Sequence, residues 1–313
     1  MKPKRLLILG VTASGKSHLG FELAKALGTD VISIDSMKVY RRMDIGTAKP
    51  SRERRQQVQY HLIDVVEPSE SYSVGMFLDQ AETVIDELES AGKPVVAVGG
   101  TALYIKSLMH GLFEGPAADH QLRNRLGQRA QIEGLDQLHR ELTRIDPSAA
   151  ERINPNDARR IVRALEVYQL TGKPISSFQT QFDADDQLKH WLIVGLRRDK
   201  AQESHRINAR VKNMVAAGLF DEVRALLAED RPLSQQAAAA IGYAEVIAHF
   251  QGQMDAQTTV EKIKINTRRL AKSQRTWFKT FAQAHWFDIP PNATTESIRD
   301  RVLDLWQADK KPT

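Results

Sequence analysis

Eight residues near the N-terminus constrain this chain more than any other feature. The sequence GVTASGKS at residues 10–17 fits the phosphate-binding loop pattern G-x-x-x-x-G-K-[ST]. The apolar run 5–9 before it predicts a buried strand, and the apolar residues after it recur at helical spacing over 17–27. Glycines let successive N–H groups turn inward on an anion, and a helix N-terminus adds partial positive charge. The loop therefore predicts a di- or triphosphate site, in which Lys16 reaches the outer phosphate and Ser17 holds Mg²⁺.

The first 110 residues alternate predicted strands and helices. Apolar runs at 31–34, 61–64 and 95–98 predict strands, and helical spacing predicts a helix over 73–91. This rhythm predicts an α/β fold with a P-loop NTPase-like parallel sheet and helices on both faces. Ligands bind such sheets at the carboxyl ends of the strands, where Asp35 and Thr101 lie in the sequence.

Asp35 and Thr101 each allow two interpretations. The Asp35 carboxylate can accept a proton or help to hold Mg²⁺, but an aspartate at this point is also a common turn or N-cap residue. Thr101 follows two glycines that permit close approach of a ligand, so its hydroxyl can bond a phosphate oxygen. It can equally cap the helix that begins after it.

The strand pattern disappears between residues 112 and 186. Helices are predicted there over 119–132, 135–145 and 156–170. A strand at 190–196 returns to the sheet, helices follow over 200–217, 219–229, 241–250 and 256–284, and 284–288 is a candidate edge strand. We therefore expect a catalytic core made of 1–111 and 187–313, with a helical insertion domain at 112–186.

Composition excludes several classes of protein. The hydrophobic and charged fractions, 42% and 27%, are ordinary for a globular chain. No apolar run approaches the roughly 20 residues that span a bilayer, so no membrane association is expected. The chain has no cysteine, which rules out disulfides and thiolate catalysis and agrees with a cytoplasmic location.

Basic residues recur at helical spacing in three places: Arg123 with its neighbours Arg125 and Arg129, then Arg159 to Arg163, and finally Arg268, Lys272, Arg275 and Lys279. Such stripes match the electrostatic footprint of a nucleic-acid backbone, although each alone also fits a solvated helix face. Either Arg206 or Arg210 could serve as a phosphate clamp.

A longer, ordered set of motifs narrows the function. DSMKVYRRMDIGTAKP at 35–50, VGGTALY at 98–104, NDARRIVRALEVY at 156–168 and IGY at 241–243 join the P-loop. Together they resemble the bacterial tRNA dimethylallyltransferases of the IPP transferase family. The resemblance implies transfer of a dimethylallyl group from dimethylallyl diphosphate to N6 of the adenosine 3′ to the anticodon, at tRNA position 37. It also implies a monomer that uses Mg²⁺ and binds the anticodon stem-loop with its insertion domain.

The resemblance also assigns roles to individual residues. Asp35 would be the general base, and Thr101 and Arg210 would stabilise the leaving diphosphate. The diphosphate would be bound by Gly10, Thr12, Ala13, Ser14, Gly15, Lys16 and Ser17, with Ser17 near the metal. The tRNA would be contacted by Asp35, Ser36, Met37, Lys38, Thr101, Arg123, Arg159, Arg160, Ile161, Val162, Arg163, Gly242, Tyr243, Lys272, Arg275 and Lys279.

The chain departs from the family pattern at Lys38, where glutamine is usual. Lysine only donates hydrogen bonds, so it cannot read a base edge as glutamine does. Three other functions remain open at this point. They are a small-molecule P-loop kinase using ATP, an RNA-binding module without an active pocket, and a relative that prenylates free AMP. A kinase would have no need of the basic helical insertion.

Overall fold

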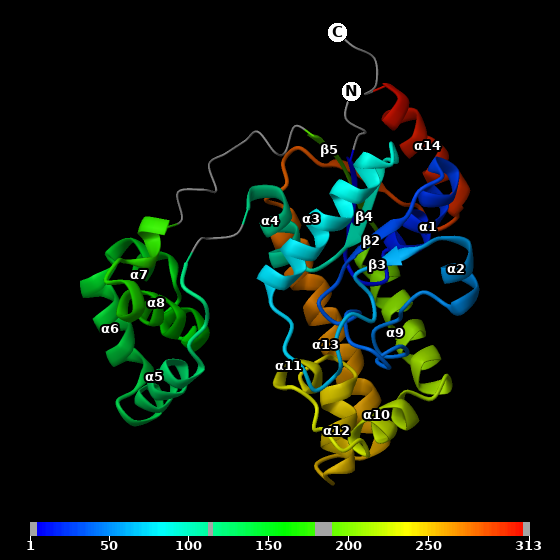
Figure 1. The fold of residues 1–313 in the computed structure, drawn as a ribbon. Helices are drawn as coiled ribbons and strands as arrows, with labels where there is room; N and C mark the ends of the chain where they lie inside the picture. Colours follow the sequence, from blue (N-terminus) through cyan, green and yellow to red (C-terminus); the bar gives the residue numbers. More distant parts are fainter. Residues whose placement is uncertain (1–4, 112–114, 179–189, 309–313) are drawn as a thin grey trace. The chain divides into compact units, whose positions relative to one another are not determined.

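The computed structural model describes residues 5–111, 115–178 and 190–308. The chain divides into two compact units, Met1–Met109 with Asp186–Thr313, and His110–Asp185. The larger unit contains a six-stranded sheet in the order β3-β2-β4-β1-β5-β6, and every pairing is parallel. This confirms the α/β fold class (Figure 1). The strands are β1 Arg5–Gly10, β2 Val31–Ile34, β3 Tyr60–His61, β4 Val95–Gly99, β5 Trp191–Arg197 and β6 His285–Asp288.

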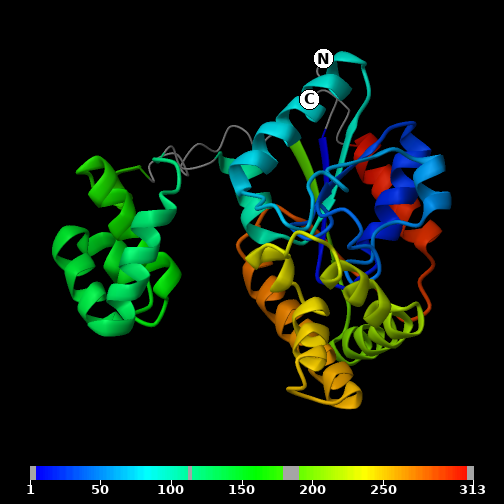
Figure 2. The same ribbon diagram turned by 60° about the horizontal axis from the view of Figure 1, so that its bottom comes forward.

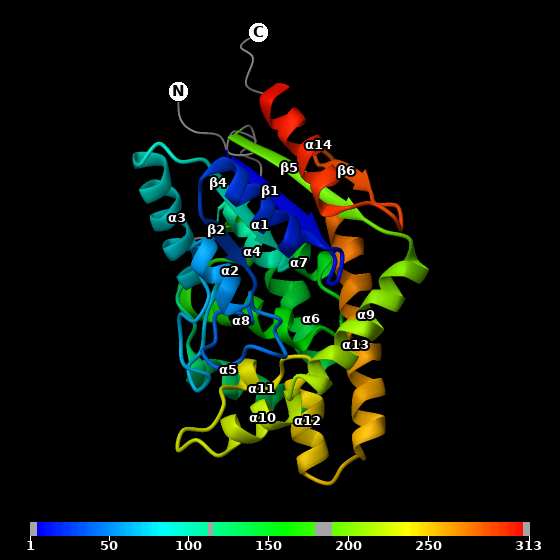
Figure 3. The same ribbon diagram turned by 90° about the vertical axis from the view of Figure 1, so that its right-hand side faces the viewer.

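Helices cover both faces of the sheet. One face is covered by α1 and α14, which pack against each other and are seen in front of the sheet in Figure 3. Their apolar side chains join those of the strands in one buried cluster that includes Leu6, Leu19 and Val302. The helices that flank the sheet are α1 Lys16–Leu27, α2 Arg52–Gln57, α3 Val74–Ser90, α4 Ala102–His110 and α14 Thr295–Ala308.

A second group of helices lies beyond the carboxyl edge of the sheet, where α9 and α12 pack against α13 and α10 packs against α9 and α12 (Figure 2). The second half of α13 runs back along the sheet and contacts β1. One long helix thus connects this group to the P-loop strand. The members are α9 Lys200–Ala216, α10 Leu219–Leu227, α11 Gln235–Ala238, α12 Tyr243–Phe250 and α13 Ala256–Phe278.

Helices are the regular secondary structure of the smaller unit among its described residues, which are 110–111 and 115–178. Four helices enclose their own apolar cluster, in which Leu126, Leu138 and Leu165 are at most 1% exposed. Asp157 caps α8 by accepting a hydrogen bond from the Arg160 N–H, so this helix begins two residues later than the pattern predicts. The helices are α5 His120–Ile132, α6 Leu135–Ile145, α7 Pro147–Arg152 and α8 Ala158–Thr171.

Two sequence predictions about the fold are wrong. The strand expected at 61–64 ends at His61, because Leu62 and Asp64 have φ of 60° and 55°, which a strand cannot accommodate. The helix expected at 256–284 ends at Phe278, where hydrogen bonds from Thr280 and Phe281 close tight turns. The apolar pattern also gave no indication of α2, α7, α11 or α14.

No helix among the described residues is long and apolar enough to span a membrane.

Substitution of Gly20 tests how closely α1 approaches the sheet, and substitution of Gly127 in α5 is the control. A Cβ on Gly20 would lie 2.3 Å from Val98 Cγ2, whereas a Cβ on Gly127 in α5 would meet nothing within 4 Å. Alanine gains roughly 1 kcal/mol over glycine inside any helix. Overpacking a β-branched neighbour costs about 1–3 kcal/mol. We therefore expect Gly127→Ala to raise the free energy of unfolding and Gly20→Ala to lower it, as measured by thermal denaturation of the full chain. Equal stabilisation by both substitutions would contradict the tight α1–β4 contact.

Candidate active site

The loops after β1, β2 and β4 begin at one level of the sheet. Gly99 pairs with Leu9 on one side and with Ile34 on the other. The N–H groups of Gly100 and Thr101 both point at the Ile34 carbonyl, at 3.3 and 3.4 Å. The structure thus confirms that the P-loop, Asp35 and Thr101 converge on the carboxyl edge of the sheet.

The P-loop has the backbone shape that an anion cradle requires. Ala13 and Gly15 have positive φ, 63° and 104°, which turns successive N–H groups toward the inside of the loop. Ser14 is 1% exposed, and its N–H donates to the Val11 carbonyl at 3.1 Å. A Cβ on Gly10 would lie 2.5 Å from Ser14 Oγ, so a larger residue there would displace the buried Ser14 side chain.

Two arginines hold the outer side of the P-loop. Arg198 donates to the Ser14 carbonyl at 2.9 Å, and Arg206 donates to the Ala13 carbonyl at 2.8 Å. Because these carbonyls point outward, the N–H groups of the loop are left to face a ligand. Arg206 therefore supports the loop through its backbone. The sequence analysis missed Arg198, although its place just after β5 at the carboxyl edge was a usable signal.

Lys16 lies where its ammonium group can meet a phosphate. Its Nζ donates to the Val11 carbonyl at 3.2 Å. Burial, followed by the neighbouring cations Lys38 and Arg210, lowers the pKa of Lys16 from 10.5 to about 7, and Asp35 opposes this shift. Burial also lowers the pKa of Arg210, again opposed by Asp35. The site is therefore positively charged and incompletely neutralised, which favours binding of a polyanion.

Asp35 forms a turn while keeping part of its carboxylate available. Its Oδ1 accepts hydrogen bonds from the N–H groups of Met37 and Lys38, at 2.9 and 3.3 Å, and no described residue donates to Oδ2. Thr101 Oγ1 accepts from the Ser36 N–H at 3.1 Å. The Thr101 hydroxyl therefore lies directly against the Asp35 turn, and its own proton remains free to be donated.

Gln274 of α13 connects two parts of the site that are far apart in sequence. Its Oε1 accepts from the Thr12 N–H at 2.8 Å, and its Nε2 donates to the Gly100 carbonyl at 2.9 Å. The residue is 8% exposed. Gln274 thus fixes the P-loop to the Gly-Gly-Thr turn, and no motif in the sequence indicated this link.

The loop after Asp35 is held at its far end by Glu222 of α10. The Glu222 carboxylate accepts hydrogen bonds from three consecutive N–H groups, those of Asp44, Ile45 and Gly46, at 2.9, 2.7 and 3.2 Å. It also accepts the Tyr243 hydroxyl at 2.5 Å. The sequence analysis missed this contact because it joins residues almost 180 positions apart.

Apart from residues 35–38 and Thr101, which lie together at the carboxyl edge of the sheet, the residues predicted to contact tRNA fall into three groups. Arg159, Arg160, Lys272 and Lys279 are exposed, whereas Val162 is half-buried. Arg123 and Arg163 both pair with the buried Glu166, and Arg275 pairs with Glu203. Burial alone would raise the pKa of Glu166, but the hydrogen bonds from Arg163, the Asp119 N–H and Arg123 lower it. These arginines stabilise their own units as well as presenting charge.

The structure corrects the prediction for a third group. Ile161 and Tyr243 are completely buried and Gly242 is also enclosed, so the two side chains pack in the core and do not face an RNA. Each lies inside a motif that mixes buried and accessible residues, and the motif alone could not separate the two kinds.

The fold and site together define a P-loop NTPase-like α/β protein with an anion cradle beside a carboxylate. A family profile described as IPP transferase matches residues 38–281. The tRNA dimethylallyltransferase of Geobacter metallireducens is 43% identical over 305 residues, which cover 97% of this chain and 98% of that protein. The chain therefore belongs to the IPP transferase family.

Solved structures agree with this assignment. A full-length tRNA isopentenylpyrophosphate transferase from Bacillus halodurans superposes with a TM-score of 0.70 at 38% identity, covering 98% of both chains. A eukaryotic dimethylallyltransferase described as acting on tRNA gives a TM-score of 0.82 at 25% identity, covering 99% of this chain and 80% of that one.

Removing the Gln274 link tests how the cradle is held. Gln274→Met keeps the side-chain volume but leaves the Thr12 N–H and Gly100 carbonyl without this partner. We expect a loss of about 1–3 kcal/mol in unfolding free energy, as is typical of an unsatisfied buried polar group. We also expect faster amide hydrogen exchange at Thr12. Gln257→Met, at an exposed position of the same helix, is the matched control. Unchanged exchange at Thr12 would show that the P-loop does not depend on this bond.

Proposed function

We propose that this protein is a tRNA dimethylallyltransferase. It transfers the dimethylallyl group of dimethylallyl diphosphate to N6 of adenosine 37, next to the anticodon, and releases diphosphate. The observation that carries this proposal is the contact between the Asp35 turn and Thr101 directly beside the P-loop. Family membership supports the same reaction, since the similar proteins are named as tRNA dimethylallyltransferases and a tRNA isopentenylpyrophosphate transferase.

The P-loop acts on the leaving group in this proposal. The bond that breaks joins C1 of the dimethylallyl group to an oxygen of the diphosphate, and the electron pair stays on that oxygen. N–H groups of the loop, Lys16 and Arg210 stabilise the developing negative charge. The Thr101 hydroxyl donates to the departing oxygen. Because these donors are fixed by the fold, they need little reorganisation during the reaction.

Asp35 acts on the nucleophile. An adenine amine is a poor nucleophile, so loss of its proton as the N6–C1 bond forms lowers the barrier. The Oδ2 atom of Asp35, to which no described residue donates, accepts that proton, while Oδ1 stays bonded to the turn. The products are the prenylated adenine and diphosphate, and Asp35 is left protonated. Transfer of this proton to water restores the carboxylate.

Magnesium fits this site only as a partner of the diphosphate. No group of three or more His, Asp or Glu side chains that could hold a metal occurs among the described residues. The exposed Ser17 hydroxyl would supply one ligand and phosphate oxygens the others, as Mg²⁺ commonly retains few protein ligands. When bound, the ion would add charge stabilisation to the leaving diphosphate.

The acceptor side relies on the basic helices. The target base must leave the anticodon-loop stack, at a cost of a few kcal/mol, and an unpaired base costs least. Phosphate contacts from the exposed arginines of α8 and the lysines of α13 would position the stem-loop. A tRNA acceptor is also consistent with a cytoplasmic monomer, which remains a prediction.

Asp35→Asn tests the proposed base. Asparagine retains the oxygen that forms the turn but accepts a proton far more weakly. We expect kcat to fall about 10²- to 10⁴-fold while tRNA affinity stays unchanged. Pyrophosphate should bind no more weakly, because the substitution removes a negative charge beside Lys16 and Arg210. The assay is mass analysis of anticodon-loop nucleosides after incubation with dimethylallyl diphosphate and unmodified tRNA, with the exposed Asp79→Asn as control. ATP-driven phosphoryl transfer by the wild type, without prenylated adenosine, would refute the function.

Arg159→Gln with Arg160→Gln tests the tRNA interface. Both side chains are exposed, so their loss should leave the fold intact. We expect weaker tRNA binding with a shallower salt dependence, because each lost phosphate contact lowers the slope by about one. Titrations at several salt concentrations measure this, and Arg144→Gln on the exposed face of α6 is the control. An unchanged slope would exclude these two residues from phosphate contact.

A further inference from the structure

The loop after Asp35, residues 36–51, begins at the proposed base but has little regular structure of its own. The structure describes this loop throughout, and it contains turns and an isolated bridge but no helix or strand. Loops longer than about 12 residues without secondary structure are uncommon in compact domains and usually serve a function. The contacts that fix the shape of this loop therefore bear on the site.

Unfavourable backbone conformations are concentrated in this loop and in the segment after β3. Among the described residues, five non-glycine residues have positive φ, and one of them, Ala13, lies in the P-loop. The other four, with φ between 49° and 60°, are Arg42, Ala48, Leu62 and Asp64. Side chains with a Cβ adopt such conformations only where surrounding contacts enforce them, commonly at functional sites.

The segment after β3 runs beside the first residues of the loop. The Asp64 N–H donates to the Lys38 carbonyl at 3.1 Å, and the Val65 N–H donates to the Val39 carbonyl at 2.7 Å. The Lys38 N–H in turn donates to Asp35 Oδ1 at 3.3 Å. The backbone of Lys38 is thus held on one side by the Asp35 carboxylate and on the other by Asp64.

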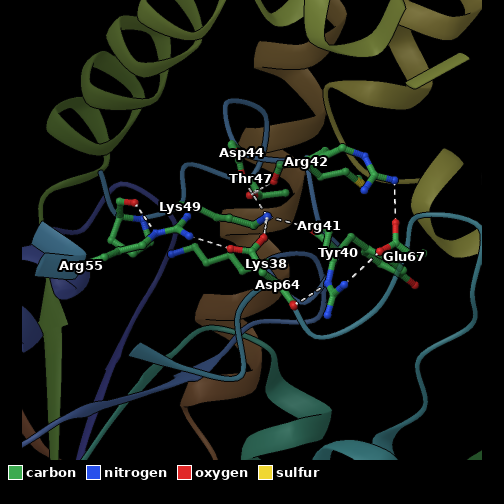
Figure 4. Close-up of polar contacts among 12 residues, drawn as sticks. Lys38, Tyr40, Arg41, Arg42, Asp44, Thr47, Lys49, Arg55, Asp64 and Glu67 are labelled. Atoms are coloured by element: carbon green, nitrogen blue, oxygen red, sulfur yellow. Dashed lines mark hydrogen bonds and ion pairs between the residues drawn. The ribbon is translucent and has the colours of Figure 1, made fainter. Parts of the chain in front are cut away.

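Lys49 joins the loop to the segment after β3 from the inside. Its side chain is 1% exposed, and its Nζ donates to the Tyr40 carbonyl, Asp44 and Asp64 at 2.5, 2.7 and 2.5 Å (Figure 4). These contacts use all three ammonium protons. The second carboxylate oxygen of Asp64 accepts from Arg55 of α2 at 2.6 Å. Lys49 and Asp64 thus hold both ends of the loop against one point.

The Lys49–Asp64 ion pair specifies a conformation more than it adds stability. Burial alone would raise the pKa of Asp64, but the hydrogen bonds and charges of Lys49 and Arg55 lower it, so Asp64 is ionised. Desolvation of a buried lysine offsets much of its attraction to a carboxylate, and the net stabilisation from such a pair is small. An ammonium group with three fixed oxygen partners nevertheless allows few arrangements of the loop.

We propose that Lys49 and Asp64 are positioning residues for the reaction. Their ion pair fixes the backbone of Lys38, and the hydrogen bond from Lys38 to Asp35 Oδ1 then keeps Oδ2 directed at the adenine N6. This inference rests on the proposed function, because it assigns the pair to the orientation of the proposed base. The three protons of Lys49 and both oxygens of Asp64 are already bonded, so the pair acts on the chemical step and not on substrate binding.

Lys49→Met tests this role in the purified full-length chain, because methionine keeps an unbranched side chain but lacks the charge. We expect kcat for prenyl transfer to fall about 10²-fold, the effect of a misplacement of roughly 1 Å. KM for tRNA and for dimethylallyl diphosphate should stay unchanged. Initial rates are measured by mass analysis of anticodon-loop nucleosides, below the melting temperature of each variant.

Lys264→Met is the matched control for loss of a largely buried ion pair elsewhere in the same unit. The Lys264 side chain is 10% exposed, and its Nζ pairs with Glu261 at 2.6 Å. We expect this variant to keep the wild-type kcat, because no contact joins Lys264 to the loop after Asp35 among the described residues.

Amide hydrogen exchange separates positioning from a general loss of stability. The N–H groups of Met37 and Lys38 both donate to Asp35 Oδ1, so they should exchange faster in Lys49→Met, whereas the Thr12 N–H should not. Asp64→Asn keeps the left-handed backbone, which asparagine tolerates, and should produce the same changes in kcat and exchange. If Lys49→Met does not fold, Asp64→Asn decides the question.

Three results would each overturn the positioning role: wild-type kcat in both variants, a rise in KM without loss of kcat, or unchanged exchange at Met37 and Lys38. A loss of kcat no larger than the loss of folded protein would do the same. Prenyl transfer by the wild type is scored separately. Its absence would refute the proposed function, whereas the exchange measurement would still show whether the pair fixes the Asp35 turn.

Discussion

The close approach of β2 and β4 is the constraint on which the site depends. A Cβ on Gly99 would lie 2.3 Å from the Ile34 carbonyl oxygen, so the two strand ends meet without any side chain between them. The same carbonyl receives the N–H groups of Gly100 and Thr101. This contact sets the spacing between the Asp35 turn and the Thr101 hydroxyl, and the P-loop lies one strand away. Backbone geometry thus positions the Asp35 turn against Thr101, and the Gln274 side chain adds the link to the P-loop.

Sequence patterns predicted the parts of this architecture that arise locally. The P-loop, the alternation of strands and helices, and the residues at strand ends all follow from short-range periodicity and motif spacing. The prediction of a strand at 61–64 was wrong because the backbone at Leu62 and Asp64 is left-handed, which ends the strand at His61. Apolar periodicity does not reveal such a backbone conformation. Helix α14 was missed although Ile298, Val302 and Trp306 recur at helical spacing and are buried against the sheet. Gln274 could not be predicted, since its partners lie 262 and 174 residues away.

The basic residues show why charge patterns need a structure. The resemblance implied tRNA contact for Arg123, Arg163 and Arg275 together with the exposed basic residues, but buried carboxylates divide these residues. Glu166 holds Arg123 and Arg163, and Glu203 holds Arg275. A carboxylate buried on the same or a facing helix is invisible to a count of positive charges along one helix. The exposed basic residues are therefore the ones that we expect to contact phosphates. The arginines paired with Glu166 and Glu203 also stabilise the unit to which they belong.

The Glu222 contact has a consequence for exchanging segments between relatives. Gly46 lies so close to Tyr243 that a Cβ there would be 2.4 Å from the tyrosine ring, and Glu222 bonds both the loop and that tyrosine. These three positions form one interlocking unit, although they come from three separate stretches of the chain. A chimera that exchanges the loop after Asp35 therefore keeps this unit only where α10 supplies the glutamate and α12 supplies the tyrosine.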